Sequence, residues 1–211
     1  MNSHAELAAT QQISASKISA YLWTSFGICF FSNISAGLIS TLMSVYLPVV
    51  VRTLSGSVSD DQLNNISAYI NALYLVGWAI GGFAWGWISD KIGRVRSLIL
   101  SVGCFGLFTF LISYAPSWEL VVALRLLSGF AVGGILVLTP TLLSEIWPQK
   151  SRSIILGIDS IGFPVGIFSS GLVNYLVADW RGAFFVGVLP ISLAIISVWS
   201  LRESENWRNA K

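Results

Sequence analysis

Six long apolar stretches, each able to cross a lipid bilayer, constrain this chain more than any other feature. A transmembrane helix needs about 20 consecutive, mostly apolar residues. The stretches cover residues 20–51, 66–88, 95–115, 120–147, 154–177 and 182–201. They are continuously apolar and do not alternate with polar residues, so they predict helices and not the strands of a barrel. The sequence therefore predicts an all-α membrane protein with six transmembrane helices.

The composition supports this class and excludes others. Charged residues make up 10% of the 211 residues, whereas soluble domains usually carry about 25%. A net charge of +2 gives no basis for a nucleic-acid partner. Cys29 and Cys104 fall in apolar stretches, which argues against a disulfide framework, and a single histidine, His4, cannot form a metal cluster. We therefore expect no metal, no cofactor and no enzymatic activity.

The distribution of basic residues predicts the orientation in the membrane. Placing the N-terminus in the cytoplasm leaves two basic residues outside, Arg52 and Arg181, and nine inside. The nine are Lys17, Lys91, Arg94, Arg96, Lys150, Arg152, Arg202, Arg208 and Lys211. Both termini are therefore predicted to be cytoplasmic, with a polar tail at 1–18, the bundle at 19–201 and a second tail at 202–211. We expect a multi-pass protein of the cell (inner) membrane.

A charged turn, GWISDKIGRVR at 86–96, lies between the second and third predicted helices. Its pattern resembles the signature loop of the major facilitator superfamily, which stands at the same place in that family. The matching positions are Gly86, Asp90, Lys91, Gly93, Arg94 and Arg96. The resemblance implies a gate, in which the aspartate faces a helix N-terminus of the opposite half of a transporter. The alternative is a positive-inside loop with a local helix cap.

Further stretches resemble the sugar-porter and metabolite–proton symporter branches of this family. RLLSGFAVGG at 125–134 is similar to the R-x-x-x-G-x-x-x-G of the fourth helix, and EIWPQKSR at 145–152 is similar to the E-x-x-P-x-x-x-R loop. The resemblance implies a cytoplasmic charge network that closes the inner side. Its expected members are Glu145, Arg152 and Glu203, near Arg94 and Arg96. The alternative is scattered surface pairs worth about 0–1 kcal/mol each.

Two departures from the family concern the first helix and the length. Proton-coupled relatives carry an aspartate near the middle of the first helix, where FFSNISAGLIS at 30–40 offers neutral Asn33 or Ser35. The family usually has twelve helices in two six-helix halves, and this chain resembles the N-terminal half. The resemblance implies a second six-helix half as partner, either another copy or a separate C-terminal half. A further alternative is that the sequence is a fragment.

Two charged residues inside predicted helices are candidates for chemistry. An intramembrane charge is costly and is by default functional. Arg125 is expected either to bind an anionic or hydroxyl-rich substrate or to snorkel to the interface. Asp159, about 10 Å inside the fifth helix, is expected to carry a proton, to bind a substrate hydroxyl, or to lie in a wet vestibule. The two enter from opposite membrane faces, so no direct pair is expected.

Polar residues at helical spacing predict cavity-lining faces on the first and fifth helices. Aromatic residues on the second helix either provide a surface for a sugar ring or pack in the core. The predicted substrate-binding set is Asn33, Ser40, Thr41, Tyr74, Trp78, Arg125, Asp159, Phe163 and Asn174. The pairs Gly129/Gly133 and Gly162/Gly166 predict close helix packing.

These observations predict transport of a small polar solute, a sugar or an organic acid, by alternating access. The chain would act in the lipid bilayer as one half of a two-bundle transporter, with the solute between the halves. The alternative is a structural or assembly subunit that keeps half of the fold and does not transport.

Overall fold

Helices connected by short turns make up the chain. The computed structural model describes residues 2–56, 59–203 and 207, with side chains described from residue 19 onward. The helices are α1 (Asn2–Ser55), α2 (Asp60–Ile92), α3 (Arg94–Ile112), α4 (Trp118–Ile146), α5 (Gln149–Leu176), α6 (Trp180–Phe184), η1 (Phe185–Gly187) and α7 (Val188–Ser200). Six stretches of the described residues are long and apolar enough to cross a membrane, the last combining α6, η1 and α7. The predicted all-α membrane fold with six spans is confirmed.

The helix ends differ from those of the apolar stretches, and α1, α2 and α5 begin earlier in polar sequence. α2 begins at Asp60 and not near residue 66, because Ser59 and Gln62 form a capping box in polar sequence. α1 begins at Asn2, so the predicted tail at 1–18 is helical from that residue. Of the predicted tail at 202–211, the structure describes residues 202, 203 and 207, and the others lie outside the described residues.

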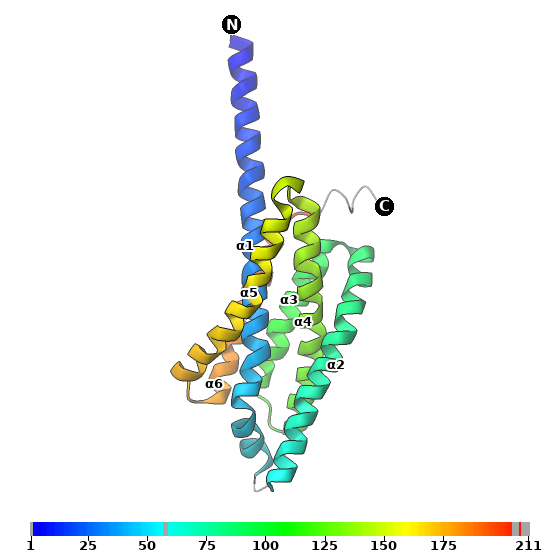
Figure 1. Cartoon of the computed structure of the whole chain (residues 1–211), viewed down its shortest axis with the longest axis vertical. Coiled ribbons are helices and arrows are strands. Elements are labelled where there is room, and N and C mark those ends of the chain that lie inside the picture. The colour runs from blue at the N-terminus through cyan, green and yellow to red at the C-terminus, as the bar shows by residue number, and fades with distance from the viewer. Residues whose placement is uncertain (1, 57–58, 204–206, 208–211) are drawn as a thin grey trace.

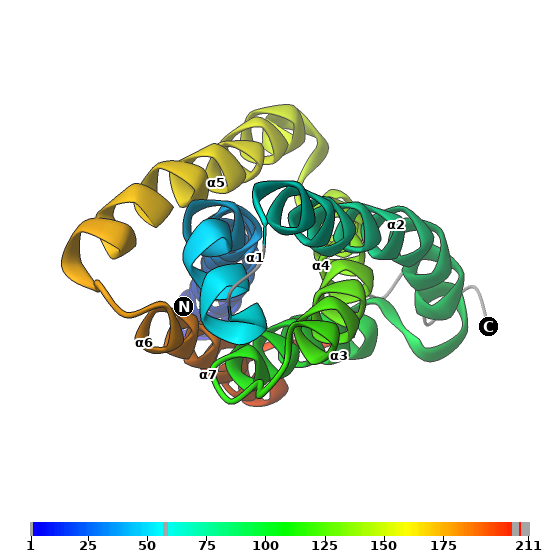
Figure 2. The same ribbon diagram turned by 90° about the horizontal axis from the view of Figure 1, so that it is seen from below.

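α1 and α4 form the centre of the bundle. Viewed along the bundle in Figure 2, α5 and α2 lie on one side of this centre, and α3 and α7 lie on the other. α1 packs on α5, α2 packs on α4, and α3 packs on both α4 and α7. In the most apolar window of each helix, 61% of α1 and 56% of α4 is buried, against 22% of α2 and 28% of α5. α2 and α5 therefore present the most exposed faces of the bundle.

The two ends of the bundle differ in charge. The α2–α3 turn and the α4–α5 turn lie together at the upper end in Figure 1. Hydrogen bonds join Arg94 to Glu145 and to Glu203, the latter just after α7. We call this the charged end. The α1–α2, α3–α4 and α5–α6 connections lie at the opposite end.

Glycines bring two pairs of helices into backbone contact. A Cβ atom at Gly129 of α4 would lie 2.2 Å from the Tyr74 carbonyl oxygen of α2, and one at Gly166 of α5 would lie 2.0 Å from the Ile34 carbonyl oxygen of α1. Only small residues allow helices to approach so closely. We call these contacts the α2–α4 seam (Gly77, Gly81, Gly129, Gly133) and the α1–α5 seam (Gly37, Gly162, Gly166). The predicted role of the two glycine pairs in close packing is confirmed.

The two seams correspond to each other if the first, second and third spans are matched with the fourth, fifth and sixth. The first span packs on the fifth, and the fourth packs on the second. The third and sixth spans meet each other at Gly106 and Gly187, where added Cβ atoms would each clash with the facing backbone. The six spans therefore form an internal repeat of three helices, a common construction in membrane proteins.

Candidate functional site

Arg125 lies inside the bundle, in the second turn of α4. Its side chain is among the most buried in the protein, with the residue 1% exposed. Nη2 donates to the Ser40 carbonyl oxygen at 3.3 Å, and the guanidinium carbon lies 3.7 Å from the centroid of the Tyr74 ring. Nε and Nη1 find no hydrogen-bond partner within the described part of the chain. The side chain therefore does not snorkel, and its cation keeps unused donors.

Aromatic rings extend from Arg125 across the exposed side of the bundle. The Tyr74 hydroxyl hydrogen-bonds the Ser40 hydroxyl. The Tyr74 and Trp78 ring centroids are 6.0 Å apart, and those of Trp78 and Phe163 are 5.8 Å apart. Four helices thus converge on one group, which we call the arginine–aromatic cluster: Ser40, Tyr74, Trp78, Arg125 and Phe163. The sequence predicted all five as substrate-binding residues.

A second buried group, the carboxylate cluster, consists of Asn33, Thr139 and Asp159. Asn33 Nδ2 donates to Thr139 Oγ1 at 3.1 Å and to Asp159 Oδ2 at 2.9 Å. The three residues are 3%, 0% and 2% exposed, so Asp159 does not lie in a wet vestibule of this bundle. Asn33 Oδ1 and Asp159 Oδ1 have no hydrogen-bond partner among the described residues.

The two clusters lie far apart along the bundle. Thr139 follows Arg125 on α4 by about 21 Å of helix, which agrees with the expectation that Arg125 and Asp159 do not pair. Arg125 meets α1 at Ser40, about 10 Å along the helix from Asn33. Thr139 was missed, although its spacing from Arg125 places it within about 40° of the same face of α4.

Two predicted substrate-binding residues join neither cluster. Thr41 is half-buried on α1, and Asn174 is exposed near the end of α5. Asn174 lies at the opposite end of the bundle from the α4–α5 turn, several helical turns beyond Phe163. Helical spacing placed these residues on the expected faces but did not determine which of them meet other polar groups.

Arg94 is the centre of a polar network at the charged end. Its Nε donates to Glu145 Oε1 at 3.0 Å, and its Nη1 donates to Ser89 Oγ at 2.7 Å and to Asp90 Oδ1. The side chains of Arg94 and Glu145 are 18% and 17% exposed, whereas that of Asp90 is 64% exposed. The Arg94–Glu145 pair is therefore not a solvated surface pair, and it ties the ends of α2, α3 and α4 together.

Glu203, which follows α7, caps the first turn of α3. Its Oε1 accepts hydrogen bonds from the backbone N–H groups of Arg94 at 2.6 Å and Val95 at 3.1 Å. A carboxylate at a helix N-terminus satisfies orphan amides and interacts favourably with the helix dipole. The sequence placed Glu203 near Arg94, but it did not reveal that backbone amides hold the carboxylate.

The remaining basic residues at this end have other surroundings. Arg152 donates from Nε and Nη2 to the Trp147 carbonyl oxygen at 3.3 and 3.2 Å, so it caps the end of α4. Lys91 Nζ lies 3.6 Å from the centroid of the Trp87 ring, and Arg96 is exposed. Among the described basic residues of the 86–96 turn, Arg94 is the one that enters the network.

The two glycines of the turn have different surroundings. Gly93 alone connects α2 to α3, with a φ of 113° that L-residues rarely adopt. A Cβ atom there would lie 2.3 Å from Glu203 Oε2. Gly86 lies within α2, and no described atom lies within 4 Å of the Cβ position. The expectation of a tight turn therefore applies to Gly93, while this bundle provides no contact that requires glycine at residue 86.

Replacing Gly93 with alanine is expected to destabilise the bundle, because the new Cβ meets the Glu203 carboxylate at a strained φ. Such strain costs about 1–3 kcal/mol, which lowers the melting temperature of a chain of this size by about 2–12 °C. Thermal unfolding of the purified protein in detergent measures the change. Gly86→Ala is the matched control and should melt at the parental temperature or slightly above it, because alanine is the better helix former. Equal melting temperatures for the two variants would contradict the assignment.

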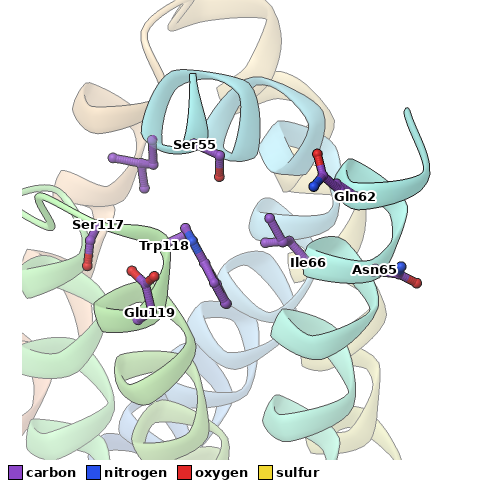
Figure 3. A pocket seen from close by; sticks show the side chains of 8 residues that line it. Ser55, Gln62, Asn65, Ile66, Ser117, Trp118 and Glu119 are labelled. Carbon is purple, nitrogen blue, oxygen red and sulfur yellow. The ribbon is translucent and has the colours of Figure 1, made fainter. Parts of the chain in front are cut away.

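A pocket of about 490 Å³ opens at the opposite end of the bundle, between the α1–α2 connection and the start of α4 (Figure 3). Its lining residues are Leu54, Ser55, Gln62, Asn65, Ile66, Ser117, Trp118 and Glu119. None of the predicted substrate-binding residues lines it. The arginine–aromatic and carboxylate clusters are therefore separate from this surface pocket.

Comparison with known proteins gives consistent matches over most of the chain. Residues 29–211 match the family model described as Major Facilitator Superfamily. The cis,cis-muconate transport protein of Acinetobacter baylyi is 28% identical over 169 residues, covering 78% of this chain and 41% of the relative. The 4-hydroxybenzoate transporter PcaK of Pseudomonas aeruginosa is 28% identical over 200 residues, covering 92% and 43%. The galactose-proton symporter of Escherichia coli K12 is 29% identical over 190 residues, covering 88% and 40%.

A solved structure supports the same fold. The xylose transporter XylE from E. coli, in a partially occluded inward open conformation, superposes with a TM-score of 0.81 at 20% identity, covering 90% of this chain and 52% of that chain. The chain spans about two-fifths of the length of the curated relatives it matches and about half of this structure.

Proposed function

The chain belongs to the major facilitator superfamily, and we propose that it moves a small polar solute across a membrane by alternating access. It acts as one half of a two-bundle transporter in the cell (inner) membrane, with the charged end in the cytoplasm as the basic residues predict. The observation that carries this proposal is the arginine–aromatic cluster, a buried cation with unused donors beside a row of aromatic rings.

Of the two solute classes, an organic acid fits this cluster better than a sugar. A guanidinium fork binds a carboxylate through two parallel hydrogen bonds. Among the described residues, no ion pair occupies Arg125, so its charge is available to an anion. The Trp78 and Phe163 rings then pack against the carbon skeleton of the solute. Relatives named for cis,cis-muconate and 4-hydroxybenzoate support this choice, and the galactose-proton symporter supports the sugar alternative.

The second half is proposed to cover the side of the bundle formed by α2 and α5. These helices are the least buried in the bundle, and the arginine–aromatic cluster reaches from α4 to both of them through Tyr74, Trp78 and Phe163. A solute held there would lie between two bundles, as in other transporters built from repeats. Another copy of this chain or a separate six-helix half fits this role.

The network at the charged end is proposed to act as part of the inner gate. Arg94, Glu145 and Glu203 hold the ends of α3, α4 and the sixth span together within this bundle. Asp90 is largely exposed, so its carboxylate remains accessible to a second bundle. Contact there would close the cytoplasmic side, and its loss would open that side.

Uptake by proteoliposomes tests the proposal. We expect the purified chain to associate as a dimer in nanodiscs and its vesicles to accumulate labelled 4-hydroxybenzoate above the level of empty vesicles, with less uptake of galactose. The mass of the assembly in nanodiscs gives the oligomeric state independently of transport. A monomer whose vesicles take up neither solute would favour the structural or assembly subunit instead.

A further inference from the structure

The carboxylate cluster has a chemistry that solute binding at Arg125 does not use. We propose that Asn33, Thr139 and Asp159 form a binding site for one sodium ion, held between α1, α4 and α5. The site stands on its own geometry. Its description as a coupling site, in which Na⁺ accompanies the solute, rests on the proposed transport function.

The first argument is charge. Asp159 is 2% exposed in the middle of a membrane-spanning bundle. Its described hydrogen-bond partners are the neutral amide of Asn33 and the neutral hydroxyl of Thr139, and no described ion pair includes it. A buried carboxylate without a cation is costly. A bound cation would remove the imbalance.

The second argument is the set of ligand atoms. Asp159 Oδ1 and Asn33 Oδ1 are buried acceptors without a donor among the described residues, and Thr139 Oγ1 accepts a hydrogen bond from the same Asn33 amide. Carboxylate, amide and hydroxyl oxygens are the ligands that hard cations prefer. A proton on Asp159 Oδ1 could be donated to Asn33 Oδ1 and would satisfy both of these atoms. A metal ion would engage the Thr139 oxygen as well, and dependence on sodium at constant pH distinguishes the two cases.

The third argument is the backbone around the cluster. Proline lacks an N–H group and leaves the carbonyl four residues earlier without its helical partner. Pro140 follows Thr139 and leaves the Leu136 carbonyl of α4 in this state, and Pro164 leaves that of Ser160, next to Asp159 on α5. Each of these carbonyls lies within about one turn of a cluster residue. Freed helix carbonyls are known ligands of Na⁺ in membrane proteins.

Thermal unfolding of the purified full chain in detergent tests the site without a transport assay. At constant pH and ionic strength, saturating NaCl is expected to raise the melting temperature by about 5–10 °C relative to choline chloride, with a smaller rise in KCl. Asp159→Asn, which is nearly isosteric, should abolish the sodium-dependent rise. Asp61→Asn, at an exposed position at the start of α2, is the matched control and should retain it.

Direct binding of radioactive sodium gives a second measurement. We expect one Na⁺ per chain, a loss of binding in Asp159→Asn and a weakening of about 10-fold or more in Thr139→Val. If Asp159→Asn fails to fold, Thr139→Val, which keeps the shape of the side chain, carries the test. Stabilisation that is equal in NaCl, KCl and choline chloride, or that follows pH alone, would overturn the sodium site. Sodium binding without solute uptake would leave the site standing and count against the transport function.

Discussion

Uptake of an organic acid is expected to fall by about 30- to 3,000-fold when Arg125 is replaced with methionine. Removing one partner of a buried, hydrogen-bonded charge pair costs about 2–5 kcal/mol, and each 1.4 kcal/mol is about tenfold in affinity. Arg125→Lys should recover little activity, because an ammonium group does not offer the guanidinium fork. Initial uptake rates in proteoliposomes, with binding followed by tryptophan fluorescence, measure the loss.

The stability of the same variant distinguishes a binding role from a structural one. Nε and Nη1 of Arg125 are buried without described partners, so methionine removes a desolvation cost and should leave the melting temperature unchanged or higher. Arg52→Met is the matched control, because Arg52 pairs with Asp60 at an exposed position. Full uptake by the Arg125→Met protein would rule out the arginine–aromatic cluster as the solute site.

The second large effect is expected at the α2–α4 seam, where two adjacent glycines should respond oppositely to alanine. A Cβ at Gly81 would lie 2.0 Å from the Phe130 carbonyl oxygen, whereas a Cβ at Gly82 meets no described atom within 4 Å. Forcing the helices apart costs about 1–3 kcal/mol or more, so Gly81→Ala should lower the melting temperature by about 2–12 °C.

Gly82→Ala serves as the internal comparison. Alanine is the better helix former by about 1 kcal/mol, so this variant should melt at the parental temperature or slightly above it. Both variants carry the same chemical change one residue apart, which leaves the seam contact as the difference between them. A Gly81→Ala protein as stable as Gly82→Ala would show that the helices separate without cost.

The six spans were predictable because a segment that crosses the lipid bilayer must be long and apolar, and hydropathy measures that apolar character. The ends were less predictable, since a capping box at Ser59 extends α2 into polar sequence and the sixth span changes helix type at Phe185–Gly187. These features depend on a few local hydrogen bonds, which average hydropathy does not register. Glycine spacing predicted close helix packing because a residue without a side chain lets two helix backbones approach each other.

The site was predictable in its charges but not in their pairing. Arg125 and Asp159 were conspicuous as ions within apolar sequence, and both are buried. Their partners depend on the axial offset of α1 relative to α4 and α5. The spacing of residues within one helix carries no information about that offset. This offset brings the Ser40 carbonyl oxygen to Arg125. The same offset brings Thr139 to Asn33, a contact between residues that no single motif links.

The two seams also have a mechanical consequence. Backbone packed directly on backbone contains no rotatable side chains that can adopt a second arrangement, so these contacts offer no route for gradual deformation. α1 with α5, and α2 with α4, should therefore keep their spacing while the molecule works. Large displacements are then left to the boundary with the proposed second bundle, against which this one would move as a single rigid body.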